Sequence, residues 1–128
     1  MKSILKPVFC VLIAFLTITL TSCNVNTKNL KKSIKYTLYE TTTNNVISKA
    51  NETYNYYYIE FKNNGELVIK YNKIENNIDK EQYGSYTKTE NMYIANIDGL
   101  TLNYIIKDNG KELECDFLVV HMIFKLQN

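Results

Sequence analysis

The chain contains no arginine, and its 15 lysines against 13 acidic residues leave a formal net charge of only +2. Nucleic-acid binding requires clustered positive charge, and direct reading of base edges favours the guanidinium fork of arginine. The composition therefore argues against a nucleic acid as a partner.

Residues for common catalytic chemistries are equally scarce. His121 is the only histidine, so the usual zinc ligand sets are out of reach. Neither a glycine-rich phosphate loop nor a Gly-x-Ser-x-Gly turn occurs. Alternation places His121 on the outer face of a strand, with no serine or cysteine nearby in sequence to act as a nucleophile. We therefore expect that the protein is not an enzyme and that it has neither a metal site nor a cofactor.

The N-terminal segment has the pattern of an export signal. Lys2 and Lys6 precede an apolar run over residues 8–20, which is shorter than the roughly 20 residues of a transmembrane helix. The following Leu-Thr-Ser-Cys sequence at residues 20–23 resembles the lipobox of bacterial lipoproteins. That resemblance implies removal of residues 1–22 and a lipid on Cys23. It also implies anchoring to the outer side of the cytoplasmic membrane, or in the outer membrane or cell surface. An uncleaved anchor or a buried N-terminal helix is the alternative.

Processing of this kind would leave a single thiol. Cys10 would depart with the signal and Cys23 would carry lipid, so Cys115 could form no disulfide within the chain. Cys115 lies between Leu113 and Phe117 in an alternating stretch. This position predicts a small buried hydrophobic residue rather than a reactive group.

Beyond a polar tether at residues 23–33, the pattern of residues 34–128 predicts one all-β domain. Short runs rich in Tyr, Ile, Val, Leu, Phe and Thr alternate with turn residues, as in a meander of antiparallel strands. Asn-Gly or Asp-Gly pairs at 64–65, 98–99 and 109–110 predict tight hairpins. The expected strands cover residues 34–41, 56–62, 66–72, 83–88, 92–97, 100–107, 111–117 and 119–126. About eight strands would form a barrel or a strongly curved sheet.

The order of these segments is similar to that of the small lipocalin-like lipoproteins of bacteria. An aromatic strand, an Asn-Gly turn and an apolar strand cover residues 57–71, and a meander ends at Phe124-Lys125. Between them stands Tyr83-Gly84-Ser85-Tyr86, at the place where that family has a Gly-x-aromatic segment that opens the second half of the barrel. Gly84 could equally mark a bulge, as glycine in a strand often does.

These patterns favour a non-catalytic binding or envelope-surface protein. The barrel interior would hold a small apolar or aromatic ligand if its own side chains leave space. The candidate lining residues are Tyr57, Ile69, Tyr86 and Tyr104. The candidate partners are the membrane, through lipid on Cys23, and an unidentified small ligand or protein.

The alternative is a protein-interaction or inhibitor module that presents a strand edge or a tyrosine-rich face. Tyr56 and Tyr58 lie on the face opposite the apolar row of their strand, where they could contact a partner or simply pack across the sheet.

Acidic residues recur at every second position of one predicted strand, at Glu112, Glu114 and Asp116. A straight strand does not converge such side chains on a cation, so we expect a solvated face.

Overall fold

The computed structural model describes residues 33–128. The expectations for the signal, for the lipobox with Cys23 and for the tether up to residue 32 lie outside this part of the chain. Within it, no helix is of a length and apolarity that would cross a membrane.

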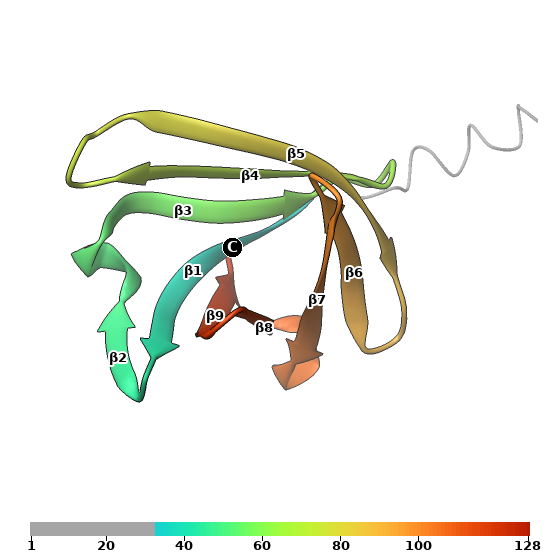
Figure 1. The fold of residues 1–128 in the computed structure, drawn as a ribbon. Helices are drawn as coiled ribbons and strands as arrows, with labels where there is room; N and C mark the ends of the chain where they lie inside the picture. The colour runs from blue at the N-terminus through green and yellow to red at the C-terminus, as the bar shows by residue number, and fades with distance from the viewer. Residues whose placement is uncertain (1–32) are drawn as a thin grey trace, which may run out of the picture. The chain divides into compact units, whose positions relative to one another are not determined.

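The described residues form one antiparallel sheet that closes on itself (Figure 1). The strands are β1 (Ile34–Thr43), β2 (Val46–Lys49), β3 (Tyr54–Phe61), β4 (Glu66–Lys73), β5 (Asp79–Lys88), β6 (Met92–Ile97), β7 (Leu100–Lys107), β8 (Glu112–Phe117) and β9 (Val120–Leu126), with single 3₁₀ turns η1 (Ala50–Glu52) and η2 (Asp108–Gly110). The sheet order is β2-β1-β3-β4-β5-β6-β7-β8-β9, and β1 also pairs with β9. The predicted all-β meander is therefore confirmed, and it is a closed eight-stranded barrel with one extra strand.

Strand β1 closes the barrel because it has partners on both edges. On one edge, its first residues pair with β3 from Ile34 to Thr37, and its last residues pair with β2. On the other edge, it pairs with β9 from Tyr36 to Thr43, with a register shift between Leu38 and Glu40. Closure satisfies backbone groups that would otherwise form an exposed sheet edge.

The predicted hairpin turns are confirmed by their backbone angles. Gly65, Gly99 and Gly110 have φ values of 90°, 83° and 89°, which glycine adopts without steric penalty. The sequence did not predict the turn before β2, where Asn44 and Asn45 have φ values of 52° and 66°. Asparagine tolerates this left-handed region better than most residues, so two of them replace the usual Asn-Gly pair.

One end of the barrel, called here the closed end, is filled by an aromatic plug made of Tyr36, Phe61, Tyr86 and Tyr93. Phe61 and Tyr93 stack with ring centroids 3.9 Å apart, and Tyr86 meets Phe61 edge to face at 5.1 Å. The hydroxyl of Tyr36 donates to the Gly110 carbonyl at 2.7 Å, and that of Tyr86 donates to the Lys62 carbonyl. These bonds tie the plug to the loops around it.

Gly84 lies in an unbroken ladder with β4 and next to the end of the ladder with β6, and neither ladder contains a bulge. It pairs with Leu67 of β4, and the neighbouring Ser85 pairs with Asn96 of β6, without a register shift. A Cβ atom at position 84 would lie 2.4 Å from the carbonyl oxygen of Asn96. Glycine is required here because two strands approach each other too closely for a side chain.

Candidate functional site

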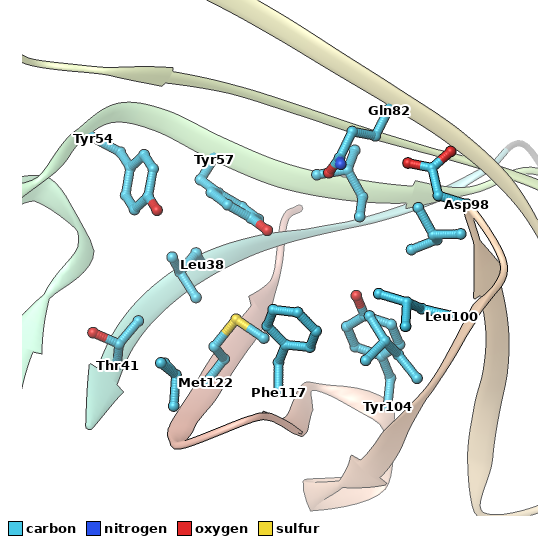
Figure 2. A pocket seen from close by; sticks show the side chains of 14 residues that line it. Leu38, Thr41, Tyr54, Tyr57, Gln82, Asp98, Leu100, Tyr104, Phe117 and Met122 are labelled. Carbon is cyan, nitrogen blue, oxygen red and sulfur yellow. The ribbon is translucent and has the colours of Figure 1, made fainter. Parts of the chain in front are cut away.

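A pocket of about 290 Å³ occupies the opposite end of the barrel, called here the open end (Figure 2). Most of its wall is apolar and comes from inward-facing residues of the surrounding strands. They include Leu38, Ile69, Ile97, Leu102, Phe117 and Met122.

The pocket exists partly because two neighbouring strands separate toward the open end. Ladder pairing between β7 and β8 covers only Ile105 to Lys107 of β7. Residues 100–104 of β7 therefore have no ladder partner on β8, and the two strands diverge in Figure 1. The wider barrel here is not filled by its own side chains.

Three tyrosines line the pocket, Tyr54, Tyr57 and Tyr104, and two of them point their hydroxyls into its middle. Tyr57 of β3 and Tyr104 of β7 both turn their hydroxyls toward its middle in Figure 2. Tyr104 is 1% exposed, and neither hydroxyl donates a hydrogen bond to another group in residues 33–128. Burial raises the pKa of both phenols well above the ordinary value of 10. Both therefore stay neutral hydroxyl groups at physiological pH.

Ring contacts hold these two phenols in place. Tyr104 meets Phe61 and Phe124 edge to face, with centroid distances of 5.9 and 5.8 Å. Tyr57 stacks on Tyr71 at 5.3 Å and meets Tyr54 edge to face at 5.0 Å. Such aromatic pairs add packing energy and restrict ring rotation. The hydroxyls are therefore fixed before any ligand enters.

The mouth of the pocket is more polar than its interior. Thr41, Gln82 and Asp98 lie there, and Asp98 is the charged residue among those that line the pocket in the described part of the chain. Asp98 belongs to the β6–β7 turn, where its φ is 53°.

Exposed aliphatic side chains occur at the open end, in the first residues of β2 and β7 and in the β4–β5 and β8–β9 connections. We call the set the aliphatic rim; it comprises Val46, Ile47, Ile78, Leu100, Leu118 and Val119. Leu118 and Val119 are 84% and 71% exposed. The strand directions place the β1–β2, β4–β5, β6–β7 and β8–β9 connections together at the open end. Clustered exposed apolar residues of this kind often mark a binding surface.

Three of the four predicted lining residues meet at this pocket: Tyr57, Ile69 and Tyr104. Tyr86 also faces inward, but it belongs to the aromatic plug at the closed end and is outside the pocket. Alternation along a strand indicates which face a residue occupies, but it does not indicate its depth along the barrel.

The sequence did not predict Tyr54 as a pocket residue, because regular alternation along a strand places residues 54 and 57 on opposite faces. A register shift between Tyr54 and Tyr56 turns both Tyr54 and Tyr57 into the barrel. Phe117 and Met122 were assigned to inward rows, yet nothing in the sequence marked them as pocket residues rather than core. The missing information is the position of the empty volume.

Tyr56 and Tyr58 lie on the outer face, with centroids 6.0 Å apart. The Tyr56 hydroxyl donates to Asp79 at 2.6 Å, and this bond to a carboxylate raises the pKa of Tyr56 to about 12. The Lys35 ammonium sits 4.3 Å above the Tyr58 ring. Tyr56 is therefore linked to β5 and Tyr58 lies against a side chain of β1, while both rings remain partly exposed.

The acidic row also lies on the outer face and has cross-strand partners. His121 lies opposite Asp116, with Nδ1 2.6 Å from the carboxylate, and Lys125 is 3.5 Å from Glu112. Glu114 is 3.8 Å from the other ring nitrogen of His121. No group of three or more potential ligands that could hold a metal occurs within residues 33–128.

Cys115 is 2% exposed, as predicted for a small core residue. Burial raises the pKa of its thiol to about 12. The reactive thiolate form is therefore scarce at neutral pH.

The fold and its pocket define a small lipocalin-like β-barrel with an aromatic plug toward one end and the apolar pocket toward the other. No protein-family model and no curated protein matches the chain. The class therefore rests on the architecture of residues 33–128.

Proposed function

We propose that this protein is a non-catalytic binding protein of the bacterial cell envelope that holds a small apolar or aromatic ligand at the open end of its barrel. The observation that carries the proposal is the apolar pocket of about 290 Å³ inside the barrel. Pockets for small molecules are typically concave, mostly apolar and equipped with a few polar groups, and this one has that composition.

The pocket size sets an upper limit on the ligand and on its affinity. Its volume is near the lower end of the range for small-molecule sites, roughly 300–1,000 Å³. A two-ring aromatic molecule would bury about 250 Å² of apolar surface, worth about 6 kcal/mol at 25 cal/mol/Å². The entropy lost on association reduces this gain, so we expect dissociation constants of about 10 μM to 1 mM.

The proposed anchor fits the direction of the chain. Strand β1 begins at the closed end, where Tyr36 bonds to the loop at Gly110, and it runs toward the open end. The junction with the proposed tether, at Ser33, thus lies at the closed end of the barrel. Metabolic labelling with a fatty-acid analogue should label the native chain and not Cys23→Ala; labelling of both would contradict lipidation at this residue.

Ligand binding is tested with N-phenyl-1-naphthylamine, whose fluorescence rises in apolar surroundings. Val120→Trp should fill the pocket and weaken binding at least tenfold. Ile123→Trp is the matched control, because Ile123 lies on the same strand but on the outer face with Glu114. Equal loss, or no loss, in the two variants would contradict binding inside the barrel.

A protein-interaction or inhibitor module is the second candidate, favoured by strand β2. In the described sheet, β2 pairs with β1 alone, and its Val46 and Ile47 are 63% and 62% exposed. A partner could add a strand to its outer edge or contact the Tyr56 and Tyr58 face. Pull-down from envelope extract distinguishes the two: a specific protein partner lost in Ile47→Lys supports the module, and a co-purifying small molecule supports the binding protein.

A further inference from the structure

The strongest unexplained feature of the pocket is the pair of unpartnered phenols whose hydroxyls point into its middle, Tyr57 and Tyr104 (Figure 2). Tyr104 is 1% exposed, yet its hydroxyl makes no hydrogen bond to the described residues, and the same is true of Tyr57. Buried polar groups are nearly always hydrogen-bonded, because leaving one unpaired is costly. Hydroxyls aimed into an empty volume therefore indicate a partner that enters that volume.

The two hydroxyls come from different walls of the barrel. Tyr57 belongs to β3 and Tyr104 to β7, and both turn toward the middle of the pocket (Figure 2). The ring contacts with Phe61, Phe124 and Tyr71 fix their directions. A ligand atom bound between them meets donors that need no reorganisation, which lowers the entropic cost of binding.

The charge of the lining excludes one class of ligand. None of the residues that line the pocket in the described chain is cationic, and Asp98 places a negative charge at the mouth. A carboxylate in this pocket would lose its hydration without gaining a cationic partner, which is strongly unfavourable. The pocket is therefore suited to neutral molecules.

We propose that Tyr57 and Tyr104 form a hydrogen-bonding subsite that selects neutral ligands with a carbonyl or ether oxygen at their buried end, and that the pocket rejects carboxylates of the same shape. The inference rests on the proposed function and names its ligand class. The ligand oxygen takes the place of the water that would otherwise satisfy the two hydroxyls.

The test compares three molecules of nearly equal shape on the full 128-residue chain. They are 2-isopropenylnaphthalene, in which a CH2 group replaces the carbonyl oxygen, 2-acetylnaphthalene and 2-naphthoic acid, the last being an anion at pH 7. Binding is measured by displacement of N-phenyl-1-naphthylamine. The ketone should bind about threefold to tenfold more tightly than the hydrocarbon, which is the effect of one net hydrogen bond. The carboxylate should bind at least tenfold more weakly than the ketone.

Phenylalanine substitutions assign the effect to the hydroxyls. Tyr104→Phe and Tyr57→Phe should each remove most of the preference for the ketone while leaving the affinity for 2-isopropenylnaphthalene within about twofold, which also shows that the pocket is intact. Tyr83→Phe is the matched control, since Tyr83 is 61% exposed and its hydroxyl donates to Glu81 outside the barrel.

The outcomes separate the two proposals. Failure of all three molecules to bind the native chain overturns the proposed function and this inference with it. Equal binding of ketone and hydrocarbon, or a preference that survives both phenylalanine substitutions, overturns the subsite and leaves apolar ligand binding in place. Tight binding of the naphthoate overturns the proposed selection against anions.

Discussion

Gly84 shows how a single residue without a side chain shapes the barrel wall. The Asn96 carbonyl and the Ile97 side chain would lie 2.4 and 3.0 Å from a Cβ at this position. The nearer atom belongs to the backbone, so it can move only if β6 shifts. The resemblance pointed to this glycine as part of a Gly-x-aromatic segment, but the close approach of β6 was not visible in the sequence.

Gly84→Ala should therefore lower the free energy of unfolding by about 1–3 kcal/mol, the usual cost of overpacking. Urea denaturation followed by circular dichroism measures the change. Ser85→Ala, an exposed neighbour on the same strand, is the control and should change the free energy of unfolding by less than about 0.5 kcal/mol. A Gly84→Ala protein as stable as the control would contradict the close approach.

At the scale of single elements, the sequence predicted strands well where alternation and turn chemistry agree. The β6–β7 hairpin was predicted with its observed bounds, because Asp98-Gly99 stands between two clearly alternating segments. The start of β5 was missed. Its first residues, 79–82, are Asp-Lys-Glu-Gln and contain no apolar side chain. They lie toward the solvated open end, where an inward-facing residue need not be apolar, so the alternation that predicts a strand is absent.

Strand β2 was missed for a different reason. Its turn is Asn44-Asn45, without the glycine that marks the other hairpins, and its apolar residues are exposed rather than alternating between core and solvent. Strand β2 lies outside the closed ring of the barrel and does not contribute to its core. Its sequence therefore lacks the alternation of apolar and polar residues that would predict a strand.

Asn45→Ala should loosen this hairpin, because alanine at a φ of 66° costs roughly 1–2 kcal/mol. The expected result is faster amide hydrogen exchange in β2, with exchange in β4 and β5 unchanged. Exchange that rises equally in all strands would show that β2 is part of the cooperative barrel. Unchanged exchange in β2 would contradict the strained turn.

At the scale of the whole barrel, residues 33–128 form a tyrosine-rich core with the aromatic plug toward one end and the pocket toward the other. The closed end was partly predictable, because the inward rows of Phe61 and Tyr86 follow from alternation. The pocket was not predictable in position, because it depends on where β7 separates from β8 and on the volume that the aromatic plug leaves free.

The buried phenols should make the protein sensitive to alkali. Burial raises the pKa of Tyr57, Tyr93 and Tyr104 in the folded barrel above the ordinary value near 10. Below pH 10 the folded and unfolded chains bind these protons equally, so these groups add no pH dependence. Above pH 10 the unfolded chain releases them while the folded barrel retains them, and the free energy of unfolding falls as pH rises.

Absorbance at 295 nm measures this effect. These buried phenols should ionise above pH 10 only together with the loss of β-structure seen by circular dichroism. Complete phenol ionisation at pH 11 in a chain that remains folded would contradict their burial.

In the function proposed here, a small neutral ligand enters the open end of the barrel. Nuclear magnetic resonance of the chain titrated with 2-acetylnaphthalene tests it most directly. We expect shifts at the Met122 methyl group and the Tyr57 and Tyr104 rings, with Tyr86 and Tyr93 of the aromatic plug unchanged. Shifts confined to Tyr56 and Tyr58 on the outer face, or no shifts at a millimolar ligand concentration, would contradict the proposed function.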